Sequence, residues 1–198
     1  MSERNATGRQ RLMWGVGALG LLVVVLLAAG LVLGDSDGDS TPAKLTEAER
    51  AAAPKILTAN LAQGNEIVDG SIEEKLAELR GVPVVVNQWA SWCTSCRAEF
   101  GFFQQLSEEL RDRVAFVGLD SQDERPAAEA FLLDFPVNYP SIFDQSAAQA
   151  ASIGGGQSWP TTVYYDETGR QTYVRQGGYS TASSLREDIE RYALSAPG

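Results

Sequence analysis

Histidine is absent from the 198-residue sequence, and only two cysteines are present. The absence of histidine excludes the commonest general base, the usual haem ligand and most transition-metal sites. The two cysteines, Cys93 and Cys96, are too close together to be explained by a structural disulfide framework. We therefore expect the chemistry of the chain to depend on other groups, with these two thiols as the first candidates.

Positive charge is scarce as well. The chain has 16 Lys and Arg residues against 26 Asp and Glu residues, which gives a formal net charge of −10. A nucleic-acid interface needs clustered basic side chains to neutralise phosphates, so this balance argues against a nucleic-acid partner. With 44% hydrophobic and 21% charged residues, the composition is typical of a globular protein, and the length suits one ordinary domain.

No charged residue occurs between residues 12 and 34, and a helix of that length crosses roughly 30 Å of hydrocarbon. The pattern predicts a transmembrane signal anchor. A cleavable signal peptide is the alternative, because small residues occupy 28–30, but the apolar core of such a peptide is only about 7–15 residues long. Arg4, Arg9 and Arg11 precede the segment, so the N-terminus is predicted to remain cytoplasmic.

This orientation divides the chain into four parts. Residues 1–11 form the cytoplasmic N-terminus, 12–34 the single-pass anchor in the cell membrane, and 35–53 a polar spacer. Within the spacer, 45–53 is compatible with a short helix or with a continuation of the tether. Residues 54–198 are then predicted to form one extracytoplasmic catalytic domain.

The predicted domain alternates between strand and helix patterns. Two short, continuously apolar runs are typical of strands buried on both faces of a sheet, and each is followed by a helical pattern. Near the end, two more strands flank a glycine-containing loop and predict a hairpin. The predicted strands are 82–89, 114–119, 161–165 and 171–174, and the predicted helices after the cysteine segment are 126–135 and 183–194. This alternation indicates an α/β fold with parallel strand pairing.

The segment WASWCTSC, residues 89–96, lies where the first predicted strand becomes a helix. Cys93 then stands at the helix start, where unpaired backbone N–H groups and the helix dipole favour a thiolate. Cys96 follows one turn later on the same side. The spacing predicts an attacking thiol, Cys93, and a resolving thiol that closes a small disulfide and releases the partner.

The cysteine pair is also compatible with half of a zinc site or with an inert structural bridge. A zinc site needs two further ligands, and the chain offers no other cysteine and no histidine for that role. The strand-to-helix context favours redox chemistry over both of these roles. We expect no metal and no cofactor besides the redox-active disulfide Cys93–Cys96.

A proline precedes the third predicted strand, in the segment SWPTT, residues 158–162. A cis bond before Pro160 would bring backbone beside the dithiol without adding a donor, whereas an ordinary trans proline opening a strand is the alternative. Together, WASWCTSC, the following Arg97-Ala98-Glu99 and WPTT resemble the TlpA/ResA-like branch of thioredoxins, which are membrane-tethered or periplasmic disulfide reductases.

The resemblance covers about residues 54–194. It implies a thioredoxin-like fold with an added strand and helix around 127–153, as in the TlpA type. It also implies that Pro160 is a cis-proline that faces Cys93 and helps to hold the substrate strand. One position departs from thioredoxin itself, because Asn87 stands where thioredoxin has a buried aspartate.

Glu99 is the candidate to replace that aspartate, and helical periodicity supports it independently. At 100° per residue, Glu99 falls on the apolar face of the helix together with Cys96 and Phe100. A carboxyl group in the core should have a raised pKa and could exchange a proton with Cys96. The alternatives are that Glu99 reaches the rim of the core or only favours the first helical turn.

Aromatic side chains flank the cysteine pair. We expect Trp92, Trp159 and Thr161 to contact the substrate, and Trp89, at the end of a buried strand, to belong to the core. The resemblance implies protein thiol and disulfide clients, a membrane thiol electron donor, and a monomer anchored in the membrane. Maintenance of reduced apocytochrome c during cytochrome c biogenesis is one role implied for such a reductase, and general disulfide repair and redox homeostasis is another.

Three further functions remain open. A peroxiredoxin-type thiol peroxidase shares the fold, but its reactive cysteine follows a Thr or Ser three residues earlier, and that position is Ala90 here. A disulfide-forming oxidant is compatible with the same cysteine spacing, because the dipeptide Thr94-Ser95 does not fix the reduction potential. A non-enzymatic Cu(I)-handling module could use the two soft thiol ligands.

Overall fold

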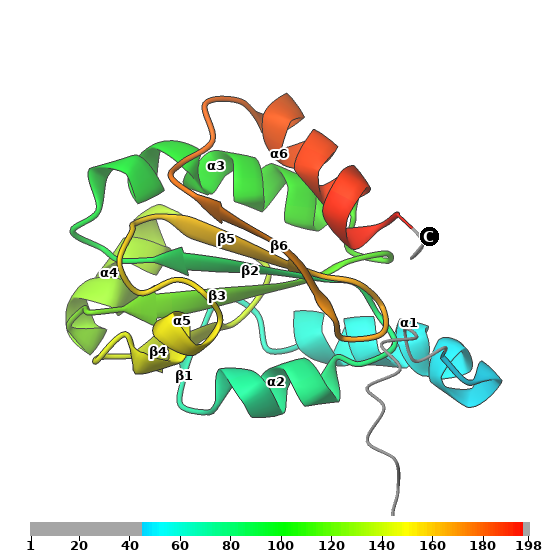
Figure 1. Cartoon of the computed structure of the whole chain (residues 1–198). Helices are drawn as coiled ribbons and strands as arrows, with labels where there is room; N and C mark the ends of the chain where they lie inside the picture. The colour runs from blue at the N-terminus through cyan, green and yellow to red at the C-terminus, as the bar shows by residue number, and fades with distance from the viewer. Residues whose placement is uncertain (1–44, 196–198) are drawn as a thin grey trace, which may run out of the picture. The chain divides into compact units, whose positions relative to one another are not determined.

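The computed structural model describes residues 45–195, which form a six-stranded sheet with helices on both faces (Figure 1). The strands are β1 (Ile67–Val68), β2 (Val84–Trp89), β3 (Ala115–Ser121), β4 (Ser141–Asp144), β5 (Thr161–Tyr165) and β6 (Gln171–Gln176). The helices are α1 (Glu47–Leu61), α2 (Ile72–Glu78), α3 (Thr94–Glu109), α4 (Arg125–Asp134), α5 (Ala148–Ser152) and α6 (Ala182–Asp188), which continues into the π-helical turn η1 (Ile189–Ala193).

The strand order is β1-β4-β3-β2-β5-β6, so β2 lies near the middle of the sheet. It pairs in parallel with β3 and antiparallel with β5. The parallel side continues through β4 to β1, and the antiparallel side ends at β6. Every residue of β2 and β3 is buried, which explains why both strands begin with an apolar run that does not alternate with polar residues. The predicted α/β class is confirmed.

The sheet separates two hydrophobic cores. Figure 1 shows α3 and α6 on one face of the sheet and α1 and α2 on the other. Phe100 and Phe103 of α3 pack into the first core, where they meet Phe131 of α4. Leu57 of α1 and Ile72 of α2 belong to the second core. Because side chains alternate along a strand, β2 contributes to both cores.

Residues 45–53, which the sequence leaves open between a short helix and the tether, fall largely within the first helix, which continues beyond residue 53. Thr46 caps α1 in a reciprocal capping box with Glu49, whose carboxylate accepts the N–H of Thr46 at 2.7 Å. Helix α1 then continues through Pro54 to Leu61. Its buried Asn60 donates to the carbonyl of Phe116 in β3 at 2.9 Å, which fastens the helix to the sheet. The folded part therefore starts before the boundary that the sequence places at residue 54.

The added elements lie where the resemblance places them. Helix α4, strand β4 and helix α5 fall within the span 127–153 or at its edge, and β4 pairs in parallel with β3. The predicted hairpin is formed by β5 and β6, and its loop is organised by Asp166, whose carboxylate accepts the N–H groups of Thr168 and Arg170. The last predicted helix is α6 with η1, which buries Leu185 against the first core.

The predicted membrane anchor, residues 12–34, lies outside the described residues, as do the predicted cytoplasmic N-terminus and most of the spacer. Among residues 45–195, no helix is both long enough and apolar enough to span a bilayer. The membrane assignment therefore stays a prediction from the sequence.

Candidate active site

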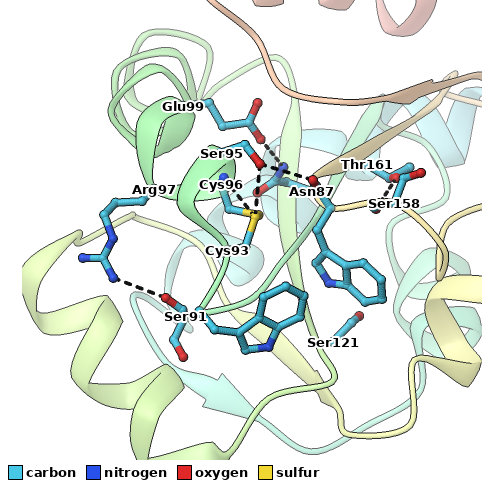
Figure 2. The surroundings of a disulfide bond; sticks show 12 residues. Asn87, Ser91, Cys93, Ser95, Cys96, Arg97, Glu99, Ser121, Ser158 and Thr161 are labelled. Carbon is cyan, nitrogen blue, oxygen red and sulfur yellow. Dashed lines mark hydrogen bonds between the residues drawn. A yellow bond between two sulfur atoms is a disulfide. The ribbon is translucent and has the colours of Figure 1, made fainter.

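The cysteine pair lies at the carboxyl end of β2, where the chain turns into α3. Cys93 is the N-cap residue of this helix, in an extended backbone conformation. Its sulfur takes the place of a capping oxygen, because it accepts the N–H of Cys96 at 3.0 Å. The two sulfurs are joined in a disulfide, whose surroundings Figure 2 shows. The Cα atoms of the two cysteines are 5.3 Å apart.

The two cysteines differ in access. Cys93 is 4% exposed, whereas Cys96 is completely buried. An external thiol or disulfide therefore reaches the sulfur of Cys93 first. Because the sulfur of Cys93 also accepts the N–H of Cys96 at the helix start, a thiolate formed there is stabilised by the helix dipole. The geometry agrees with Cys93 as the attacking thiol and Cys96 as the resolving thiol.

Ser95 links the dithiol to the proline loop, a role that its sequence context did not indicate. Its hydroxyl lies 3.5 Å from the sulfur of Cys93 and donates to the carbonyl of Trp159 at 3.2 Å. The peptide bond between Trp159 and Pro160 is cis, as the resemblance implies. The hydroxyl of Ser95 thus joins the CxxC turn to the loop that precedes β5, and this pairing of distant segments has no signal in the local sequence.

A side chain of β2 forms a hydrogen bond with the segment that leads to the proline loop. The N–H of Gly156 donates to the buried side-chain oxygen of Gln88 at 2.9 Å. Thr161 is fully buried, and its hydroxyl donates to the carbonyl of Ser158 at 2.8 Å. Its side chain therefore stabilises the loop, and the substrate contact expected for Thr161 stays a prediction.

Two tryptophans lie at the rim of the site. Trp92 is 54% exposed, and its ring centroid is 5.4 Å from that of Trp159, which is half-buried. The substrate contact expected for both tryptophans stays a prediction. Trp89 belongs to the core, as expected, where it packs edge-on against Phe100 at 5.2 Å.

Glu99 lies one turn after Cys96 and has no exposed surface. One carboxylate oxygen accepts the side-chain amide of Asn87 at 3.1 Å, and the other accepts the backbone N–H of Tyr179 at 2.8 Å. Burial raises the pKa of Glu99 to about 7, although these two hydrogen bonds and the charge of Arg175 act in the opposite direction. The prediction of an acid turned toward the core is correct, and the rim alternative is wrong.

Asn87, at the position of the missing aspartate, is the neighbour of this acid. Its side-chain oxygen is buried and has no donor among the described residues. A protonated Glu99 could supply that donor, since the amide can present either its oxygen or its nitrogen after a flip. Asn87 therefore matches both protonation states of Glu99, which suits a residue that gains and loses a proton.

The turn before Cys93 is held by the loop between β3 and α4. Asp123 accepts the backbone N–H of Ser91, and also its hydroxyl at 2.8 Å. The indole N–H of Trp92 donates to the carbonyl of Gln122 at 2.8 Å. Sequence reasoning missed these contacts. A usable signal was the acidic segment directly after β3, because the carboxyl ends of parallel strands meet at one edge of a sheet.

Arg97 of α3 contacts both the turn before Cys93 and helix α4. Its guanidinium donates to the carbonyl of Ser91 at 3.2 Å, which Figure 2 shows. The group also lies 5.1 Å from the ring centroid of Phe131 and 5.0 Å from that of Phe135. Among residues 45–195, no group of three potential metal ligands is arranged to hold an ion.

Comparison with known proteins decides the family. The Redoxin family profile matches residues 59–189, which is more than half of the chain. The chain belongs to the Redoxin family. The Redoxin chain is 31% identical over 162 residues to the thiol:disulfide interchange protein DsbE of Vibrio cholerae, which covers 79% of this chain and 82% of that protein.

Two further relatives agree. The thiol-disulfide oxidoreductase ResA of Geobacillus kaustophilus is 25% identical over 123 residues, covering 61% of this chain and 66% of that protein. The crystal structure of a DsbF homologue from Corynebacterium diphtheriae is similar with a TM-score of 0.54 and 34% identity, over 59% of this chain and 75% of that chain. Within the Redoxin family, the protein is a thiol-disulfide oxidoreductase of the TlpA/ResA/DsbE-like group, with Cys93 and Cys96 as its cysteine pair.

Proposed function

We propose that this Redoxin protein is a disulfide reductase of protein clients. The surroundings of Cys93 carry the proposal. The sulfur meets the N–H of Cys96 and the neutral hydroxyl of Ser95, and no cationic side chain of the described residues hydrogen-bonds to it. The nearby guanidinium of Arg97 is bound to the carbonyl of Ser91 instead. Strong oxidants owe their high potential to a strongly stabilised thiolate, and this site offers only moderate stabilisation.

The exchange proceeds in two steps. In the first, the thiolate of Cys93 attacks a client disulfide and forms a mixed disulfide, and the first client thiolate leaves and takes up a proton from solvent. In the second, Cys96 loses its proton and attacks the sulfur of Cys93, which breaks the mixed disulfide and releases the second client thiolate. Two electrons have then passed to the client, and the protein disulfide has formed.

Glu99 is the proposed acceptor of the Cys96 proton. It is one helical turn away on the same buried face, and its pKa of about 7 lets it hold either protonation state near neutral pH. The reverse transfer, from Glu99 to the departing sulfur of Cys96, serves the re-reduction of the protein. If Glu99→Gln leaves the pH dependence of cysteine alkylation unchanged, this proton role is wrong.

The direction of electron flow is tested by the reduction potential. We expect equilibration of the full chain with glutathione to give a value well below about −200 mV, as for a reductant. A value near about −120 mV would instead identify a disulfide-forming oxidant. A Cys96→Ser variant, which cannot resolve the mixed disulfide, should trap clients covalently, and the Cys93→Ser variant is its matched control.

The same preparations test the two remaining alternatives. Consumption of hydroperoxide at a rate comparable to disulfide exchange would favour the peroxidase. Tight stoichiometric Cu(I) binding without disulfide exchange would favour the copper module. We expect neither result, because relatives that this chain matches over about four-fifths of its length are named as thiol:disulfide interchange proteins.

We further propose that the protein is a monomer held in the cell membrane by residues 12–34, with its catalytic domain outside. The uncharged length of this segment and the preceding arginines support the proposal. The resemblance adds a membrane thiol carrier as electron donor and apocytochrome c thiols as one client class. After reduction of intact cells, a membrane-impermeant maleimide should label Cys93. Labelling only after lysis would place the domain on the cytoplasmic side.

A further inference from the structure

Asp120 is a buried carboxyl group that the exchange reaction does not use. It is the penultimate residue of β3 and has no exposed surface. No donor among the described residues reaches either of its oxygens. A buried carboxylate without donors is strongly disfavoured, so this group needs either a proton or a partner.

The position of Asp120 in the sheet brings it beneath the active-site turn. It pairs in register with Trp89, the last residue of β2, and directly paired residues point to the same face. Trp89 packs against α3 and α4 on that face. Asp120 therefore lies on the α3 side of the sheet, at the edge from which the chain continues through Ser91 to Cys93.

A second buried carboxyl group, that of Asp123, follows three residues later, and its proximity helps to raise the pKa of Asp120. Asp123 is 5% exposed and already accepts the N–H and the hydroxyl of Ser91, together with the N–H of Glu124 at 2.8 Å. Both side-chain oxygens of Asp123 therefore already accept hydrogen bonds. A hydrogen bond between two carboxyl groups requires a proton on one of them, and the donors around Asp123 leave that proton to Asp120.

We infer that Asp120 is a positioning residue for the reaction: in its protonated form it donates to Asp123 and so keeps the Ser91–Trp92 turn in the conformation that presents Cys93. Loss of the proton replaces this hydrogen bond by repulsion between two buried carboxylates. The turn, with the indole of Trp92 on the neighbouring carbonyl of Gln122, should then loosen. The inference rests on the proposed function only for its effect on client reduction.

The charged groups around Asp120 favour the protonated form of its carboxyl group. Burial raises its pKa to about 8, and the negative charges of Asp123 and of Asp144 in β4 act in the same direction, whereas the charge of Arg125 lowers it. Arg125 is engaged elsewhere, with the carbonyl of Ile67 and the carboxylate of Asp69.

Helix α3 offers no other partner. Its Glu99 is bonded to Asn87 and Tyr179, and its Arg97 lies on aromatic rings and the carbonyl of Ser91. On α4, Glu129 and Asp134 are exposed to solvent, and Glu124 before the helix is exposed as well. Asp120 is thus neutral near pH 7 and ionises above about pH 8.

The direct test follows the oxidised full chain in detergent micelles by NMR, because the disulfide removes thiol titration. We expect the carboxyl ¹³C signal of Asp120 to titrate near pH 8, and the indole signal of Trp92 to change with it. Asp120→Asn keeps a donor at every pH and should abolish the change at Trp92. The exposed Asp134→Asn is the matched control. Titration of Asp120 at its ordinary value, or an unchanged Trp92 transition in Asp120→Asn, would overturn the inference.

The kinetic test compares insulin reduction by Asp120→Asn and the wild type, because the ratio of the two rates cancels other pH effects. We expect a ratio near 1 at pH 6.5 that rises about fivefold by pH 9, the change that one hydrogen bond of about 1 kcal/mol makes. Asp120→Ala, which lacks the donor, should be slow at both pH values. The same ratio is then measured in proteins that also carry Glu99→Gln. A pH dependence that persists in these proteins belongs to Asp120 and not to Glu99.

The two proposals fail separately. A ratio that stays flat while both proteins reduce insulin would refute the positioning role and leave the proposed function intact. If neither protein reduces insulin, the proposed function fails, and the NMR titration still decides whether Asp120 holds the turn.

Discussion

Replacement of Glu99 by Gln should change how the stability of the protein depends on pH. The carboxyl group has no exposed surface, and burial raises its pKa from 4.5 to about 7. The folded chain therefore binds this proton more tightly than the unfolded chain does. Its contribution to stability is fully present below about pH 4.5 and is lost as pH rises toward about 7.

The size of the effect follows from the two pKa values. Between pH 5 and pH 8, the wild type should lose about 2.5 kcal/mol of unfolding free energy that the Glu99→Gln variant retains. The amide is a fair replacement at low pH, because its oxygen can still accept the N–H of Tyr179 and its NH₂ group can donate to the unpaired oxygen of Asn87.

Urea denaturation of the oxidised full chain in detergent measures this difference. Both proteins are unfolded at pH 5, 6, 7 and 8, and the difference between their unfolding free energies is plotted against pH. The unfolding free energy of the variant, relative to that of the wild type, should increase steadily with pH. Glu108→Gln, an exposed change on the same helix, controls for the loss of one charge. Parallel curves for wild type and Glu99→Gln would refute the reasoning, because they would mean that Glu99 titrates alike in both states.

Three further predictions concern packing and are checked by the same denaturation assay at one pH. Gly118→Ala should destabilise the fold by roughly 1–3 kcal/mol, because its Cβ would lie 2.0 Å from the hydroxyl of Ser141 within the sheet. Asn60→Ala should cost about 1–3 kcal/mol, since the buried carbonyl of Phe116 loses its donor. Leu133→Ser should stay within about 0.5 kcal/mol, because the side chain is 81% exposed.

The centre of the site was predictable because its signals are local. Continuous apolar residues located β2, and the Cys-x-x-Cys spacing fixed the start of α3 with both sulfurs on one side. Helical periodicity then showed that Glu99 faces the core, since a face is determined by angle alone. The cis bond before Pro160 followed from the resemblance.

The partners of the site were not predictable, because they come from segments distant in the chain. The hydroxyl of Ser95 meets the carbonyl of Trp159, and the carboxylate of Asp123 meets Ser91, and each contact depends on the register between strands. Local patterns identify a strand and its faces, but they do not fix which residue stands opposite which. Tyr179 reaches Glu99 in the same way, from 80 positions further along the chain.

Helix α1 shows how tertiary contacts outweigh a local signal. A proline inside a helix costs about 3 kcal/mol or more, so Pro54 marks a boundary on propensity alone. The capping box of Thr46 on one side and the burial of Leu57 and Asn60 on the other compensate for it. The short helix that the sequence leaves open for residues 45–53 is present and continues past Pro54, because helix ends and buried residues act on the whole element.

Two buried acids lie near one dithiol, so the pH dependence of disulfide exchange by this protein reflects the protonation of both. Glu99 changes protonation at about pH 7 and Asp120 at about pH 8, so the wild-type profile contains overlapping transitions. Their neutral replacements have opposite consequences. Glu99→Gln removes a group that must accept a proton and should slow the second exchange step, whereas Asp120→Asn preserves a donor and should protect the turn at high pH. Only the double variant, compared with each single one, assigns each transition to its acid.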